Sequence, residues 1–84
     1  MAELPAPIGS IYAYLIRDDD GREGLAVAEL FDGRPVHLIA ADEGRLAKLT
    51  PLAEELARSE GATILLVEFT SRRDIREITG PAHG

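Results

Sequence analysis

Apolar and polar residues alternate in short runs through the first half of the chain, a pattern typical of β-strands. Residues 11–16 are rich in aromatic and β-branched side chains and predict a first strand. A second strand is predicted over about 25–31 and a third over 34–41. Asp32 and Gly33 lie between them, and this dipeptide is typical of a type I′ hairpin turn. The first half therefore predicts an antiparallel meander of three strands.

The second half of the chain changes to the spacing of an amphipathic helix. Asp42 is a good N-cap for this helix, and Gly61 is a good residue to follow its last turn. Pro51 lies inside the pattern and predicts a kink or a division into two pieces, because proline has no backbone N–H. The apolar positions, which recur at intervals of three and four, are Leu46, Leu49, Ala53 and Leu56.

Residues 63–69 predict a fourth strand that is apolar on both faces. The segment Ser71-Arg72-Arg73-Asp74 resembles a capping box and predicts a short C-terminal helix through Ile78. Residues 1–10 predict an irregular lead-in and residues 79–84 a frayed tail. The expected fold is thus a single α+β domain over residues 1–84 with the order βββαβα.

A helix between the third and fourth strands reverses the chain, so the fourth strand is expected to run parallel to the first and third. This gives a four-stranded mixed sheet, packed by one kinked helix and a short C-terminal helix. The same reasoning places the acidic segment 18–24 at one end of the sheet together with the start of the main helix at Asp42. Arg72, Arg73 and Arg76 are expected at that end too.

The predicted helices are too narrow to cover both faces of the predicted sheet. Four strands make a sheet about 19 Å wide, whereas one helix is about 10 Å across. Both faces nevertheless look apolar, because Leu65 and Val67 point one way while Ile64 and Leu66 point the other. Either the C-terminal helix wraps around to the second face, or a second molecule packs there. The second alternative favours a homodimer or a complex with another protein.

Composition narrows the class of partner. The chain has 84 residues, a net charge of −6 and no cysteine, so disulfides and thiolate zinc sites are excluded. The acidic balance argues against direct binding of nucleic acid and is compatible with a basic protein, including one that itself binds nucleic acid. No apolar run is long enough for a membrane span, and no signal peptide is recognisable, so the expected location is the cytoplasm.

The acidic run Asp18-Asp19-Asp20-Gly21 does not fit a calcium-binding loop. With Gly21 at the sixth position of an EF-hand, the first and twelfth positions would fall on Ile16 and Val27, which offer no carboxylate. The run is expected to be a solvated turn, or a surface for basic groups of a partner. Tyr12 and Tyr14 share one strand face and suit an interface anchor, or else pack beneath a terminal segment. The candidate partner-binding residues are Asp18, Asp19, Asp20, Glu23, Tyr12 and Tyr14.

No catalytic or cofactor site is recognisable. Arg72, Arg73 and Arg76 at the start of the expected C-terminal helix are candidates for anion binding, although they could pair with the acids instead. His37 and His83 are the only histidines, and their positions predict no metal site. No serine lies in a nucleophile-elbow pattern. The sequence therefore predicts a protein that is not an enzyme and has no cofactor.

Three functional hypotheses remain. The first is a non-enzymatic interaction or inhibitor module that presents an acidic, partly apolar surface. In size and charge the chain is similar to small inhibitors of phages and mobile elements, anti-CRISPR proteins among them, and Asp18–Asp20 with Glu23 would then mimic phosphates. The second is a homodimeric accessory protein in which the acids only aid solubility. The third is a small anion-ligand-binding or enzyme domain that uses the arginines.

Overall fold

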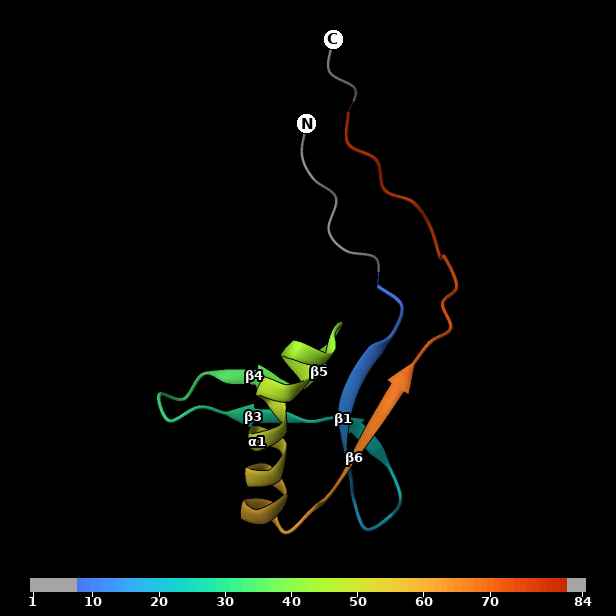
Figure 1. Cartoon of the computed structure of the whole chain (residues 1–84). Helices are drawn as coiled ribbons and strands as arrows, with labels where there is room; N and C mark the ends of the chain where they lie inside the picture. The colour runs from blue at the N-terminus through green and yellow to red at the C-terminus, as the bar shows by residue number, and fades with distance from the viewer. Residues whose placement is uncertain (1–7, 82–84) are drawn as a thin grey trace.

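The structure is a computed structural model that describes residues 8–81. Outside the described residues lie residues 1–7 of the expected lead-in and residues 82–84 of the expected tail, which include His83. One helix and six strands in two antiparallel sheets make an α+β fold (Figure 1). The elements are β1 (Ile11–Arg17), β2 (Glu23–Leu25), β3 (Val27–Glu29), β4 (Pro35–His37), β5 (Ile39–Ala40), α1 (Glu43–Glu60) and β6 (Thr63–Phe69).

Strand β1 is the centre of the larger sheet. On one side it pairs with β6 over seven residues, from Ile11 opposite Phe69 to Arg17 opposite Thr63. Its other side is shared by two short strands, because β2 pairs with its second half and β5 with its first half. All three neighbours run antiparallel to β1. The sheet is therefore effectively three strands wide, with β1 between β6 and the β2–β5 edge.

Three residues form the junction at which the chain leaves and re-enters the larger sheet. Ala26 donates its N–H to the Tyr14 carbonyl at 2.9 Å, and Tyr14 donates to the Leu38 carbonyl at 2.9 Å. Leu38 closes the ring by donating to the Ala26 carbonyl at 3.0 Å. Ala26 and Leu38 are completely buried. The ring satisfies the backbone groups that the diverging strands would otherwise leave unpaired.

Between Ala26 and Leu38 the chain forms the separate hairpin of β3 and β4. Gly33 donates its N–H to the Leu30 carbonyl at 2.8 Å, and Leu30 donates to the Arg34 carbonyl at 2.9 Å. The prediction of a type I′ turn is wrong, because that turn needs positive φ at both central residues and only Gly33, at 86°, has it. The three-residue loop instead ends in a left-handed glycine, and Phe31 is fully exposed at its tip.

The expected meander with one parallel strand is wrong, for a reason that lies at this junction. The predicted second and third strands each divide in two, so β5 pairs with β1 rather than with the strand before it. The helix then carries the chain back, and β6 is added to the far edge of β1 in the antiparallel sense. Strands β5 and β6 run in the same direction, but β1 separates them.

Helix α1 begins and ends at the predicted residues. The Asp42 side chain accepts a hydrogen bond from the Arg45 N–H at 2.7 Å, and Gly61 at φ 60° closes the last turn. The helix continues through Pro51 as one element, so the prediction of two pieces is wrong. Beside the proline, the Thr50 hydroxyl donates to the Leu46 carbonyl at 3.0 Å and accepts from the Tyr14 hydroxyl at 2.7 Å. These contacts tie the helix to β1.

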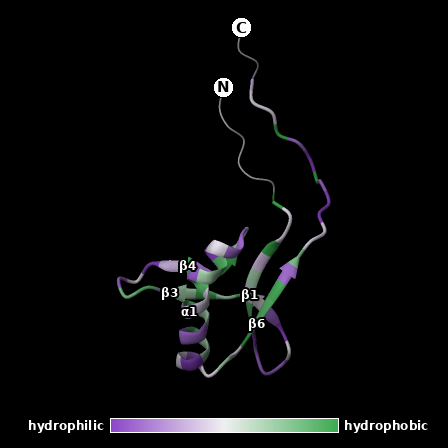
Figure 2. Cartoon of the chain, in the orientation of Figure 1, coloured by the Kyte–Doolittle hydropathy of each residue, from purple (hydrophilic) through white to green (hydrophobic). Residues whose placement is uncertain are grey.

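The core lies between α1 and one face of the strands. Its buried members come from both sheets and from the helix, so the hairpin and the larger sheet share one core. Figure 2 shows green, apolar segments on β1 and β6 and mixed colours along α1. The buried core residues are Tyr14, Ala26, Ala28, Leu38, Ala40, Leu49 and Ala53.

The predicted C-terminal helix does not form. Residues 70–81 contain no helix or strand, and Figure 1 shows them leaving the end of β6 as an extended segment, here named the arm. Its two large apolar side chains, Ile75 and Ile78, are 75% and 79% exposed. The capping pattern at Ser71 is not sufficient, because so short a helix is marginal in water unless its apolar side chains are packed, and those of Ile75 and Ile78 remain exposed. No helix within residues 8–81 has the length and apolarity needed to cross a membrane.

Candidate functional site

The face of the larger sheet that points away from α1 is the main candidate surface. Residues directly opposite each other in a sheet share a face, so the register assigns the faces. Tyr14 and Ile16 pack towards the helix, and the alternate residues of β1 therefore point to the other side. We name that side the open face. Its members are Ile11, Ala13, Leu15, Leu25, Ile39, Leu65, Val67 and Phe69.

The open face is apolar, and no described helix or strand packs over it. Ile39 is 44% exposed and Phe69 is 51% exposed, although both are large hydrophobic residues. Ala13, at the centre of the face, is only 2% exposed. None of the eight members carries a charge. A contiguous exposed apolar surface of this kind is typical of a binding site, because its burial is favourable.

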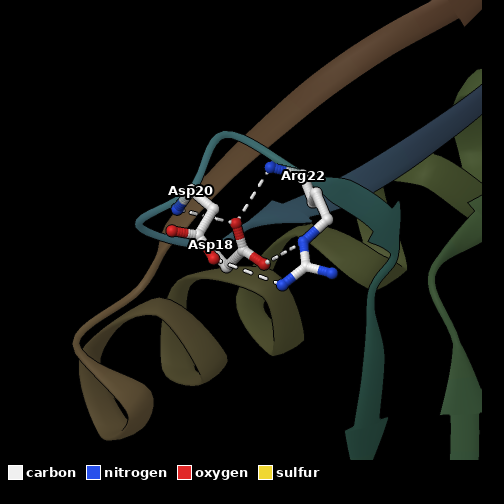
Figure 3. Close-up of polar contacts among 3 residues, drawn as sticks. All are labelled: Asp18, Asp20 and Arg22. Carbon is white, nitrogen blue, oxygen red and sulfur yellow. Dashed lines mark hydrogen bonds and ion pairs between the residues drawn. The ribbon is translucent and has the colours of Figure 1, made fainter.

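The acidic turn that follows β1 borders one end of this face. Arg17 and Glu23 lie opposite each other on the open-face side of β1 and β2 and form an ion pair at 2.9 Å. The Asp18 carboxylate accepts hydrogen bonds from the N–H groups of Asp20 and Arg22, both at 2.9 Å (Figure 3). The turn is thus organised by its own charged residues.

Three of the four predicted partner-binding acids already contact arginines. Asp18 lies 3.4 Å from the Arg22 guanidinium, and Asp20 lies 3.2 Å from it. Glu23 contacts Arg17, as described above. Asp19 is exposed and forms none of these contacts. All of the pairs are exposed, so each contributes little stability, but together they reduce the charge that the turn offers to a partner.

We expect Asp18 and Asp19 to differ in their effect on folding. Asp18→Ala should lower the free energy of unfolding by about 1 kcal/mol, because two turn N–H groups lose their acceptor. Asp19→Ala, which removes the same charge one residue away, should change it by less than about 0.5 kcal/mol. Urea unfolding followed by circular dichroism measures both values. Equal effects from the two variants would show that net charge, and not the hydrogen bonds, governs the turn.

An open hollow of about 600 Å³ lies between this turn and the end of α1. Its charged lining consists of four acids and two arginines, so the hollow is acidic overall. Gly61 and Ala62 line it as well, which places it beside the start of β6. The charged residues are Arg17, Asp18, Asp19, Arg22, Glu23 and Glu60.

The two predicted tyrosine anchors lie on the helix side of the sheet. Tyr14 is only 8% exposed and bonds to Thr50, so it is a core residue rather than a surface anchor. Tyr12 is half-buried on the same face. Alternation along β1 places the two tyrosines on one face, as predicted, but alternation alone does not show which face the helix covers. The hydrophobic residues of the open face, absent from the predicted site, could have been found from the alternation in 63–69.

The expected meeting of acidic and basic segments at one end of the sheet is wrong within a single chain. The acidic hollow lies beside the start of β6, whereas the arm leaves from the end of that strand. Arg72 pairs with Asp74 inside the arm at 2.9 Å and remains exposed, as do Arg73 and Arg76. Because no helix forms there, the anion site predicted at these arginines lacks its helix dipole.

His37 lies exposed in β4, and no cluster of three potential metal ligands occurs within residues 8–81. Comparison of the chain with protein-family models, curated proteins and solved structures finds no significant match. The surfaces described above are therefore the indications of what the protein does. Of these, the open face and the acidic hollow combine the clearest chemistry with the most definite geometry.

Proposed function

We propose that this chain is a non-enzymatic protein–protein interaction module that binds a partner protein through its open face. One observation carries the proposal: an uncharged face spans three neighbouring strands, and its large residues Ile39 and Phe69 stay about half exposed. Covering such side chains contributes roughly 25 cal/mol for each Å² removed from water, so a matching apolar surface would bind there.

Charge indicates the chemistry of that partner. The acidic turn and the Arg17–Glu23 pair border the open face at one end, and the chain carries a net charge of −6. A partner with an apolar patch flanked by basic residues would match both features. Proteins that bind nucleic acid often carry such basic surfaces, and they belong to this class.

An inhibitor that mimics phosphates is a finer version of the same hypothesis. It would use Asp18, Asp19, Asp20 and Glu23 against a basic groove. The ion pairs with Arg17 and Arg22 count against this version, because they already neutralise part of the negative charge of the turn. The proposal of binding through the open face does not depend on that charge. Changing these four acids to Asn and Gln should abolish binding if phosphate mimicry operates, and should leave it unchanged if the open face alone binds.

Photo-crosslinking in cells tests the proposal. The photoreactive residue p-benzoylphenylalanine would replace Phe69 on the open face or, as a control, Lys48 on the exposed side of α1. We expect a defined crosslinked protein from position 69 and none from position 48. Ile39→Asp, which adds a charge to the same face, should remove that product. Identical products from both positions, or no product from position 69, would contradict the proposal.

A homodimer is the second candidate, and a different observation favours it. The outer edge of β6 pairs with no strand among the described residues. This edge is separate from the open face, so self-association and partner binding are compatible.

A further inference from the structure

The outer edge of β6 offers backbone groups in a regular row. Tyr14 uses its N–H and C=O on the side of Ala26 and Leu38, away from β6. Because bonding direction alternates along a strand, the residues on either side of Tyr14 are the ones that bond to β6. Their partners in β6 are the odd-numbered residues. The N–H and C=O groups of Ile64, Leu66 and Glu68 therefore point to the outer edge.

Nothing in the sequence of this strand discourages pairing. Proteins commonly protect an edge strand with lysine, proline or a bulge. Strand β6 has none of these, and its only charged residue is Glu68. Leu66, at its centre, is 51% exposed because it faces the helix side of the sheet but lies at the margin. The edge thus combines unpaired backbone groups with exposed apolar side chains.

We propose that two copies of this chain pair through β6, antiparallel, about a twofold axis at Leu66. Centring the axis on Leu66 pairs all seven residues of both strands and keeps the open faces on one side. Leu65 then lies opposite Val67, and Glu68 lies opposite Ile64, so no two like charges meet. The twofold axis makes the contact self-complementary and closed.

Charge at the strand ends supports the antiparallel direction. In this arrangement the arm of one copy continues past Thr63 of its partner, along the acidic hollow. Phe69 of one copy lies opposite Thr63 of the other, so the arm is directed towards Gly61 and Glu60 of that copy, which line the hollow. The hollow has more acids than arginines, and the arm brings three arginines against two acids. The acidic and basic segments that lie apart within one chain are therefore brought together between two chains.

The dimer does not depend on the proposed function, because it uses the strand edge and leaves the open face free.

Light scattering during size-exclusion chromatography tests the dimer. The wild-type chain should elute with twice the mass of 9.1 kDa at about 100 μM. Leu66→Lys places two like charges on the axis, and so does Leu66→Glu. Each should raise the dissociation constant at least about 100-fold, the loss expected when two buried leucines are replaced. Lys48→Glu on the exposed side of α1 is the matched control and should leave the dimer intact.

Mixing the two Leu66 variants gives the decisive result. A lysine opposite a glutamate should restore pairing, so equal amounts of Leu66→Lys and Leu66→Glu should form a heterodimer. Circular dichroism confirms that each variant is folded. A monomeric wild type, a dimer that both variants leave intact, or a mixture that remains monomeric would overturn the proposal. If position 69 still crosslinks a partner in that case, the proposed function survives without the dimer.

Disulfide trapping tests the register and the arm. The chain contains no cysteine, so introduced thiols report only on the new pair. Ala62→Cys in one copy and Thr70→Cys in the other should form a disulfide on mixing, because these positions lie opposite each other about Leu66. Ala47→Cys on the helix, mixed with Thr70→Cys, should not. Equal yields from both mixtures would contradict the register.

Discussion

Leu38→Ala is expected to lower the free energy of unfolding by about 3 kcal/mol. The Leu38 side chain is completely buried and lies in the core with Tyr14 and Leu49. Removing it leaves a cavity that the surrounding residues can fill only in part, because the backbone at this position is fixed by hydrogen bonds to Tyr14 and Ala26. A loss of this size is a large share of the stability of so small a domain.

Urea unfolding at a fixed protein concentration measures this loss, since a dimer would make the midpoint depend on concentration. Ile39→Ala is the matched control. It removes a side chain of similar size from the next residue, but Ile39 is 44% exposed on the open face. We expect a loss below about 1 kcal/mol for this control. Equal losses for both variants would show that the core does not centre on Leu38.

Ala26→Pro is expected to destabilise the fold by at least about 3 kcal/mol. Proline removes the N–H that bonds to the Tyr14 carbonyl, and Ala26 is completely buried, so no water can replace the lost donor. The hydrogen-bond ring at the junction would be open, and the chain could no longer leave the sheet into β3 without an unpaired polar group.

Ala26→Gly separates the backbone effect from the side chain. Glycine keeps the N–H and loses only the methyl group and some backbone restriction, so we expect a loss of about 1–2 kcal/mol. Hydrogen exchange at the Leu38 amide should be faster in the proline variant than in the glycine variant. If both variants unfold alike, the ring of hydrogen bonds has no special part in stability.

Local signals in the sequence predicted the ends of the main helix and the positions of two strands. Asp42 and Gly61 bound the helix because capping depends only on neighbouring residues. Residues 11–16 and 63–69 formed strands because their composition is unambiguous. In each case the physical cause lies within a few residues of the predicted feature.

Strand pairing could not be predicted in the same way. Ala26 and Leu38 read as interior residues of two longer strands, since nothing local marks them as a junction. Their role follows from hydrogen bonds to Tyr14, which is distant in sequence. Without this junction, the sequence pattern pairs residues 34–41 with residues 25–31 instead of with β1, and it gives the wrong direction for β6 relative to β1. The predicted convergence of acids and arginines depended on that direction.

The candidate surface was predicted in part. Alternation in β1 and β6 revealed two apolar faces, but the choice between them depends on where the helix packs. Because the helix packs on the face that contains Tyr14, this residue lies in the core and not at an exposed interface. The acidic turn was recognised, whereas its internal pairing with Arg17 and Arg22 is a matter of side-chain geometry. The face that the helix covers and the ion pairs of the turn both depend on three-dimensional packing, which local sequence patterns do not reveal.

The central position of β1 affects how the protein is made. This strand is synthesised well before its longest partner, because Ile11 pairs with Phe69. The hydrogen-bonding groups on one edge of β1 therefore stay unpaired until residues 63–69 have been synthesised. Pairing between residues so distant in sequence slows folding. Until β6 has been synthesised, Ala13 and Leu15 lack their partners in that strand and are available for non-native contacts.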